Sequence, residues 1–443
     1  MRIMNETLKF PDGFKWGSAT SAHQVEGGNY NDWTVWEKSP ERIAQLKKEG
    51  KDPSDFISGR ACDSYNRYEE DFDIAKKLNQ NIHRFSVEWS RIEPEEGRFN
   101  FEAIKHYQRL VNALRDRGIE PMVTLWHFTN PIWFAENGGW LNKKSPEYFT
   151  RYAKYVVDNL KDRVGLWITF NEATTVYANQ AYLKGEWPPQ HKNIFKFFRV
   201  RKNFIKAHSL AYREIKQIYN VSQATQNSTL GMSHNPILQR TSTSQNAATL
   251  CDISLMSHNV AVGLVENNVY FSGGKLLKGL GVVKMLNWLQ LHAWSKTLPY
   301  QDFLGLNYYR DYKLPGSKES DNGLIPEMPL WRIYPKGIYH CLTELKKFKK
   351  PIFITENGIA DWTDKLKGKF IKDHLCWIWR AIQDGVDVRG YLYWSLLDNF
   401  EWAHGFAPRF GLVGIDYATL ERKIRPSAHE YAKICLTNQL ETD

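Results

Sequence analysis

The 443-residue sequence has no long hydrophobic run and little cysteine. No apolar stretch reaches the roughly 20 residues that a membrane span requires, and no apolar segment typical of a signal peptide follows Met1. The five cysteines are scattered and form no C-x-x-C pair, so neither a disulfide framework nor a structural zinc site is indicated. We therefore expect a cytoplasmic protein, in a reducing compartment, with no membrane partner.

Motifs for several kinds of chemistry are also missing. No G-x-G-x-x-G follows a predicted strand, and the sequence contains no P-loop, no H-E-x-x-H and no G-x-S-x-G. These absences argue against dinucleotide binding, P-loop phosphate chemistry, zinc-dependent proteolysis and serine hydrolases of the elbow type. We expect no cofactor and no metal.

The formal net charge is +10, which can indicate a nucleic acid or an anionic surface as partner. The alternative is an ordinary solvated surface with lysines spread along helices. No basic run of five or more residues occurs, so we favour the solvated surface and expect no nucleic-acid partner.

Aromatic residues are abundant, with 17 Trp, 22 Tyr and 23 Phe, together 14% of the chain. Most aromatic side chains pack in cores, and we assign Trp16, Trp89 and Trp126 to the core. Aromatic faces also stack on the C–H faces of sugar rings. A pocket that combines tryptophans with carboxylates would suit a pyranose.

The hydrophobic patterns alternate between strand and helix along the whole chain, which favours an α/β fold with a parallel sheet. A (β/α)8 TIM barrel, folded as a single domain over residues 1–443, accounts for eight such strands. The residues beyond a minimal barrel fall in long βα loops at 26–59, 311–329 and 399–417, on the catalytic face. Strands are predicted at 14–20, 81–89, 120–128, 166–172, 229–235, 303–309, 352–356 and 389–397, and helices at 63–78, 101–117, 146–162, 195–219, 247–262, 279–294, 334–347, 369–384 and 426–436.

Two of the predicted strands end in a carboxylate, Glu172 in the fourth and Glu356 in the seventh. Because parallel barrel strands all present their C-terminal ends to one face, these side chains should face each other across the barrel mouth. Two carboxyl groups are the minimum for glycoside hydrolysis, and a separation of about 5–5.5 Å would make the reaction retaining. Arg84, on the second strand, is a candidate cation that would lower the pKa of the nucleophilic carboxylate.

Four longer motifs resemble those of glycoside hydrolase family 1, the β-glucosidase and β-galactosidase family. They are FPDGFKWGSATSAHQVEG at 10–27, TFNE at 169–172, ITENG at 354–358 and YWSLLDNFEW at 393–402. The resemblance covers nearly the whole chain and implies that Glu172 is the general acid/base and Glu356 the nucleophile. It also implies a small-molecule β-glycoside or a short oligosaccharide as substrate. The residues implied to bind this substrate are Gln24, His127, Asn171, Asn307, Tyr309, Trp331, Trp394, Glu401 and Trp402.

Several of these residues have a simpler structural interpretation when taken alone. His127 could be a core histidine bonded to the backbone, Trp394 and Trp402 could be core packing, and Asn307 could form a turn after its strand. The resemblance favours the functional interpretation at each position. Ala173 departs from the family pattern, which usually has Pro after the acid/base.

Three alternatives concern the reaction itself. One branch of the family cleaves 6-phosphoglycosides and carries Ser where this chain has Glu401; Pro408 and Phe410 stand where that branch has Lys and Tyr. A carboxylate at 401 would repel a phosphate, so we expect unphosphorylated β-glucosides or close relatives such as β-galactosides or β-fucosides. A transglycosidase that uses the same glycosyl-enzyme intermediate, or a non-catalytic carbohydrate-binding barrel, stays open. The sequence does not rank the glycones or define the aglycone or the oligomeric state.

Overall fold

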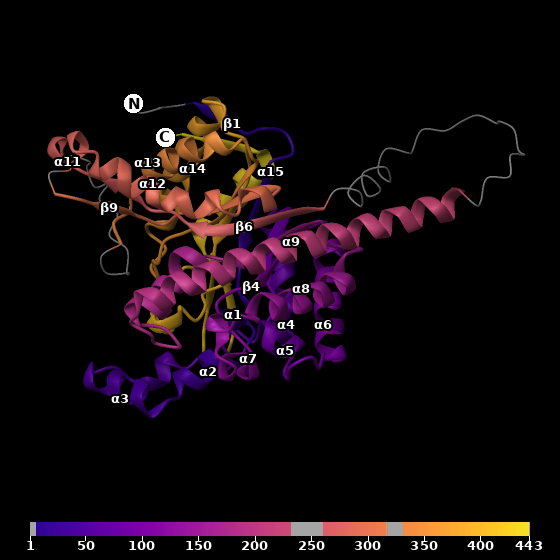
Figure 1. Ribbon diagram of the computed structural model, residues 1–443. Coiled ribbons are helices and arrows are strands. Elements are labelled where there is room, and N and C mark those ends of the chain that lie inside the picture. The colour runs from indigo at the N-terminus through magenta and orange to yellow at the C-terminus, as the bar shows by residue number, and fades with distance from the viewer. Residues whose placement is uncertain (1–5, 232–259, 316, 318–330, 443) are drawn as a thin grey trace, which may run out of the picture.

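A computed structural model describes residues 6–231, 260–315, 317 and 331–442. Eight parallel strands close into a barrel, and helices surround it (Figure 1), which confirms the predicted (β/α)8 TIM barrel. Around the barrel the strands are β2 (Lys15–Ala19), β3 (Ile82–Ser86), β4 (Glu120–Trp126), β5 (Leu166–Asn171), β6 (Ala261–Asn267), β8 (Phe303–Asn307), β10 (Ile352–Asn357) and β11 (Val388–Trp394).

The outer layer consists of amphipathic helices that bury one side against the barrel. Helix α9 (Ile194–Gly231) runs beside α8 (Ser145–Leu160) and is the longest element in Figure 1. Asn100 shows how local sequence sets a boundary, because its side chain accepts hydrogen bonds from the amides of Glu102 and Ala103 in the first turn of α6 (Phe101–Asp116). The long helices are α4 (Ser64–Lys77), α6 (Phe101–Asp116), α8 (Ser145–Leu160), α9 (Ile194–Gly231), α12 (Val282–Ser295), α13 (Lys336–Leu345), α14 (Lys367–Gln383) and α15 (Pro426–Thr437).

Shorter elements build the loops at both ends of the barrel. The helices α1 (Ala22–Val25), α2 (Asp32–Glu37), α3 (Pro40–Lys48), α5 (Trp89–Ile92), α7 (Ile132–Glu136) and α11 (Lys275–Gly279) belong to this set. Three small sheets pair β1 (Thr7–Lys9) with β14 (Gln439–Glu441), β7 (Tyr270–Ser272) with β9 (Asp311–Lys313), and β12 (Val413–Ile415) with β13 (Arg422–Ile424). The β1–β14 pair joins the two ends of the chain.

The prediction of the fifth barrel strand at 229–235 is wrong. Residues 229–231 belong to α9, residues 232–235 lie outside the described residues, and the fifth barrel strand is β6. The predicted helix at 247–262 overlaps the start of β6 and is otherwise outside the described residues. Short apolar runs do not distinguish a buried strand from a buried helix by periodicity, and the segment AVGLVEN was therefore divided at the wrong point.

A layer of buried apolar side chains fills the interior of the barrel, so the barrel is a packed core and not a pore. Seven strands each contribute one buried apolar residue to this layer: Ile82, Met122, Ile168, Val265, Phe303, Phe353 and Leu392. A larger core lies between the barrel and the helices, and it contains Trp16, Trp89 and Trp126, as predicted.

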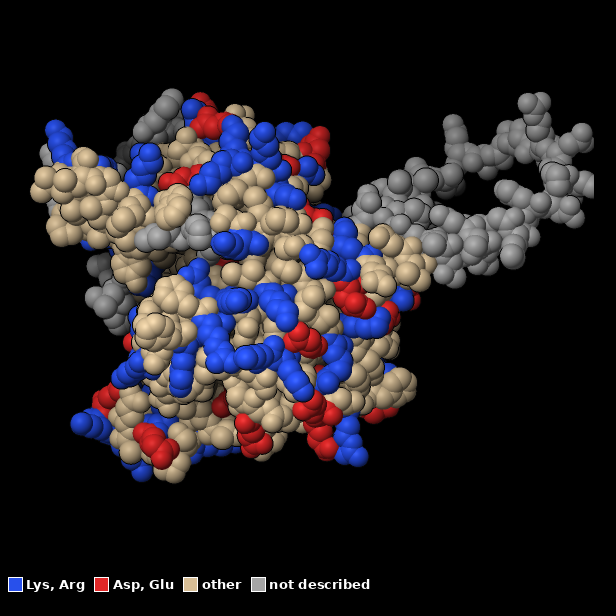
Figure 2. Space-filling model, viewed as in Figure 1, with Lys and Arg blue, Asp and Glu red and all other residues tan. Residues whose placement is uncertain are grey.

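Lysine and arginine side chains are spread over the face shown in Figure 2, interspersed with acidic and uncharged residues. This distribution fits the solvated surface that we favoured from the sequence. Within the described part of the chain, no helix has both the length and the apolar character needed to cross a bilayer.

Candidate active site

The C-terminal ends of the barrel strands open into a pocket of about 740 Å³. Most of the site residues proposed from the sequence meet there, although they lie at or after five different barrel strands, β4, β5, β8, β10 and β11. Three of the predicted residues do not line the pocket but donate hydrogen bonds to residues that do. They are Gln24, Asn307 and Arg84. The predicted residues that line the pocket are His127, Asn171, Glu172, Tyr309, Trp331, Glu356, Trp394, Glu401 and Trp402.

Glu356 lies near the end of β10, a strand whose residues are all buried. The fully buried Arg84 donates from Nη1 to Glu356 Oε1 at 2.6 Å, and the Tyr309 hydroxyl donates to Oε2 at 2.6 Å. Burial leaves the pKa of Glu356 above its ordinary value, although Arg84 and Tyr309 act to lower it. Glu356 is therefore a buried carboxylate with a cation at bonding distance.

Glu172 follows β5 and has a left-handed backbone, with φ of 47°. Its Oε1 accepts hydrogen bonds from the amides of Asn307 at 2.7 Å and Asn267 at 3.0 Å. Burial, and next the charge of Glu356, raise the pKa of Glu172 to about 8. The partners of Glu172 are neutral amides, whereas those of Glu356 include a guanidinium, so the two carboxyls have different environments.

Asn171 connects the two carboxyl groups. Its Oδ1 accepts from Arg84 Nη2 at 2.7 Å and from Asn307 Nδ2 at 3.2 Å, and its own amide lies 3.2 Å from His127 Nε2. Asn307 is thus part of the site and not a turn former, since its Oδ1 also accepts from the hydroxyl of Thr355 at 2.7 Å. The network fixes the amide groups beside both carboxyls.

His127 is not a core histidine satisfied by the backbone. Burial, and then the nearby Arg84, lower the pKa of His127 well below its ordinary value, so the imidazole is neutral. Its Nδ1 has no hydrogen-bond partner among the described residues. A buried nitrogen without a partner on the wall of a pocket can bond to a ligand hydroxyl.

Glu401 and Gln24 belong to a second group of polar side chains at the pocket. Gln24 Nε2 donates to Asn399 Oδ1 at 2.9 Å, to the Phe400 carbonyl at 2.9 Å and to Glu401 Oε2 at 3.3 Å, and its Oε1 accepts from Ser21 Oγ. Burial, then the charge of Glu356, raise the pKa of Glu401 to about 8.

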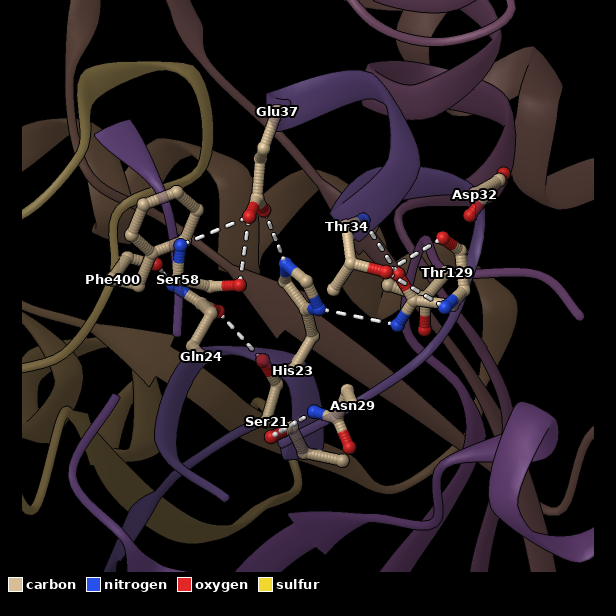
Figure 3. A network of polar contacts seen from close by, with 12 residues as sticks. Ser21, His23, Gln24, Asn29, Asp32, Thr34, Glu37, Ser58, Thr129 and Phe400 are labelled. Atoms are coloured by element: carbon tan, nitrogen blue, oxygen red, sulfur yellow. Dashed lines mark hydrogen bonds and ion pairs between the residues drawn. The ribbon is translucent and has the colours of Figure 1, made fainter. Parts of the chain in front are cut away.

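A buried ion pair supports this side of the pocket from behind (Figure 3). His23, next to Gln24 on α1, lies 2.8 Å from Glu37 Oε1, and Glu37 Oε2 accepts two hydrogen bonds from Ser58. Burial lowers the pKa of His23, but Glu37 outweighs this effect and leaves that pKa raised. The His23 ring stacks on Trp402 at 5.4 Å between centroids, which fixes the indole plane.

Further apolar side chains line the pocket together with polar residues such as Arg201 and Gln290. Trp331 contacts Tyr309 and Phe410, and the guanidinium of Arg310 lies 5.4 Å from the Trp331 ring centroid. Other apolar lining residues are Leu183, Phe197, Val269, Phe271, Leu286 and Tyr312.

Sequence reasoning missed the contribution of β6. Asn267 bonds to Glu172, and the buried Glu266 bonds to Thr174 and Thr175 in the segment after Glu172. The available signal was the run AVGLVEN, which ends in Glu and Asn like the strands that carry Glu172 and Glu356. Because the fifth strand was assigned elsewhere, these residues were not considered.

Comparison with known proteins agrees with this geometry. The model of the family named Glycosyl hydrolase family 1 matches residues 6–440. The chain belongs to glycosyl hydrolase family 1. It is 32% identical to β-glucosidase A of Thermotoga maritima, over 98% of this chain and 99% of that protein.

Two further proteins are similar to this chain over nearly their whole length. The chain is 30% identical to a 6-phospho-β-galactosidase of Clostridium acetobutylicum, over 97% of this chain and 98% of that protein. The structure of a β-glycosidase from Pyrococcus horikoshii superimposes with a TM-score of 0.78 at 34% identity, covering 98% of this chain and 97% of that one. The protein described here is therefore an enzyme, a β-glycosidase of family 1.

Proposed function

We propose that the enzyme is a retaining exo-β-glycosidase that hydrolyses unphosphorylated β-glucosides or close relatives, such as β-galactosides and β-fucosides. The observation that carries this proposal is the difference between its two buried carboxyls. Glu356 has Arg84 and Tyr309 as partners, which favour its ionised form, while Glu172 has a pKa raised to about 8 and neutral amide partners.

The two environments suit a double displacement. In the first step the Glu356 carboxylate attacks the anomeric carbon while protonated Glu172 gives its proton to the leaving oxygen. In the second step Glu172, now ionised, takes a proton from water, which attacks the same carbon and releases the sugar with its original anomeric configuration. Asn171 lines the pocket next to Glu172 and can bond to the 2-hydroxyl of the sugar. Apart from the attacking water, both steps use only groups of this chain.

The other polar residues support recognition of a neutral sugar. Buried Glu401 and the free Nδ1 of His127 can bond to hydroxyls, with Trp394 and Trp402 as apolar faces beside them. Glu401 bonds only to the neutral side chains of Gln24 and Trp394, so it brings no cation to a phosphate, and its ionised form would repel the dianion. Although one relative is named a 6-phospho-β-galactosidase, we therefore propose an unphosphorylated glycone.

We further propose that residues 1–443 form one domain and that the enzyme works in a reducing, cytoplasmic compartment. The second proposal is supported by the cysteines at 62, 341, 376 and 435, each of which is free. Transfer of the glycosyl group to sugar or alcohol acceptors would use the same intermediate and remains the second candidate activity.

The decisive experiment measures turnover of aryl β-D-glucoside, galactoside, fucoside, mannoside and 6-phosphoglucoside by wild type, by Glu356→Ala and by Glu344→Ala as control. Glu344 lies on α13, outside the pocket lining. We expect a neutral glycoside to be cleaved with initial release of the β-anomer, read by NMR, and turnover to be lost only in Glu356→Ala. Near wild-type turnover by folded Glu356→Ala would refute the assignment of the nucleophile, and turnover of the phosphoglucoside alone would refute the choice of glycone.

A further inference from the structure

The helical segment that follows Glu172 lacks the usual hydrogen bonds from the side chain of its N-cap residue. Glu172 is the N-cap residue of the π-helical segment η3 (Ala173–Tyr177). The side chain of an N-cap normally accepts hydrogen bonds from the free amides two and three residues later. Glu172 makes no such bond, because its carboxyl points to Asn307 and Asn267 at the pocket. The first amides of η3 must therefore be satisfied by another residue.

Glu266 on β6 takes the place of the missing cap. Its Oε1 accepts from the Thr174 hydroxyl at 2.6 Å and amide at 3.4 Å, and its Oε2 accepts from the Thr175 hydroxyl at 2.5 Å and amide at 3.1 Å. The Thr175 hydroxyl in turn accepts from the backbone amide of Asn267 at 3.2 Å. One fully buried carboxylate thus binds both residues at the positions that a cap would serve.

The same strand also holds the carboxyl of Glu172 itself. Asn267, the residue after Glu266, donates to Glu172 Oε1, and the Glu172 amide donates to the Val265 carbonyl at 2.8 Å. Three successive residues of β6 therefore fix the backbone, the side chain and the following helical turn of Glu172. The left-handed backbone of Glu172 is sterically costly for a residue with a Cβ and persists only where its surroundings hold it.

We propose that Glu266 is a positioning residue for general acid catalysis, which caps the segment after Glu172 and holds that carboxyl at the leaving-group oxygen. It does not line the pocket, so it acts through Glu172 and not on the substrate. This inference rests on the proposed function, in which Glu172 is the acid/base.

The negative charge of Glu266, like its hydrogen bonds, supports Glu172 as the general acid. Burial leaves the pKa of Glu266 raised, while the four donors that bond to it and the cation Arg201 act against this rise and favour the ionised carboxylate. The ionisable groups that interact with Glu172 include Glu356 on β10, Glu266 on β6 and Tyr309 just after β8. Both carboxylates raise the pKa of Glu172 and so keep it protonated for the first step.

The test compares two glycosides that share a sugar and differ in the leaving group. A 4-methylphenyl glycoside needs protonation of its leaving oxygen, whereas a 2,4-dinitrophenyl glycoside does not. In Glu266→Gln one acceptor oxygen becomes an amide donor that faces Thr174 or Thr175, so the cap is lost in part and the charge completely. We expect kcat/KM for the 4-methylphenyl glycoside to fall about tenfold, a fraction of the roughly 10²–10⁴-fold that a general acid supplies.

For the 2,4-dinitrophenyl glycoside we expect kcat/KM within about twofold of wild type, because this step hardly uses the acid. The basic limb of kcat/KM against pH, which reports loss of the Glu172 proton, should move to lower pH once the neighbouring negative charge is gone. Thr174→Val, which removes one hydroxyl donor, should show the same leaving-group dependence to a smaller degree and provides the test if Glu266→Gln does not fold.

The matched control is Glu93→Gln, a buried glutamate that also accepts several hydrogen bonds but does not line the pocket. It should leave both substrates and the pH profile unchanged. Equal losses on both substrates in Glu266→Gln, or no loss on either, would overturn the inference. If the wild type cleaves neither substrate, the proposed function fails instead, so the two failures are distinguishable.

Discussion

The buried contact between Arg84 and Glu356 allows a quantitative prediction. Arg84→Met keeps most of the side-chain volume but removes the guanidinium that donates to Glu356 and to Asn171. A hydrogen bond to a charged group contributes about 1.5–3 kcal/mol. Because 1.36 kcal/mol corresponds to one pKa unit, losing this bond should raise the pKa of Glu356 by about one to two units.

The acidic limb of kcat/KM against pH reports ionisation of the nucleophile in the free enzyme. We expect Arg84→Met to shift this limb upward by about one to two pH units and to lower the maximum rate, because Asn171 also loses its partner. The free energy of unfolding should fall by about 3–5 kcal/mol at neutral pH, the usual cost of leaving one buried charge unpaired. A pH profile with 4-nitrophenyl glycoside, together with urea unfolding, measures both effects.

Arg84→Lys is the control, since an ammonium keeps the charge but cannot bond to Glu356 and Asn171 with the fixed fork of a guanidinium. It should restore much of the acidic limb and less of the maximum rate. If folded Arg84→Met keeps the wild-type acidic limb, then Arg84 does not set the ionisation of Glu356 and our account of the nucleophile is wrong.

Two further predictions concern the other buried carboxyls. The pKa of Glu172 is raised from 4.5 to about 8 in the folded state. Between about pH 4.5 and 8 the folded enzyme therefore binds more protons than the unfolded chain. For this reason the contribution of Glu172 to the free energy of unfolding falls as pH rises through this range. Glu172→Gln removes that loss. Because one pKa unit corresponds to 1.36 kcal/mol, thermal unfolding should show a variant more stable than wild type by up to about 4 kcal/mol at pH 8 and no more stable at pH 4; a constant difference at both pH values would contradict this. Glu401→Ser should lower kcat/KM for the neutral glucoside by about tenfold or more, through loss of hydrogen bonds to sugar hydroxyls, and raise the relative rate on the 6-phosphoglucoside. Parallel assays of both substrates test this, and an unchanged ratio would show that Glu401 does not discriminate.

The barrel and the two principal carboxyls could be predicted because their signals are local. Strands β5 and β10 are continuous apolar runs that end in Glu, and the rule that such ends share one face of a barrel brings Glu172 and Glu356 together. Residues such as Gln24 and Trp402, from opposite ends of the chain, could be named only through the family resemblance. No periodicity in the sequence places α1 beside the loop that follows β11.

The part that sequence reasoning missed depends on register and on contacts between strands. Once the fifth strand was assigned to 229–235, the end of β6 had no defined position, and Glu266 was one of many unremarkable glutamates. The Ala–Thr–Thr sequence after Glu172 was noted only for its missing proline. Neither observation has meaning until the structure brings Glu266 within hydrogen-bonding distance of both threonines.

Glu172 and Glu266 together show how this chain resolves a conflict between local structure and chemistry. A carboxylate at an N-cap stabilises its own helix, but only if it turns toward the free amides, and it then cannot reach a substrate. In this enzyme the residue at the N-cap faces the pocket instead, and a second carboxylate from the neighbouring strand bonds to the free amides. The arrangement costs the burial of another charge, which is tolerable because four donors surround it. It follows that the threonine pair directly after Glu172 and the glutamate at the end of β6 depend on each other. Changing either alone should slow the acid-catalysed step before it lowers the stability of the fold.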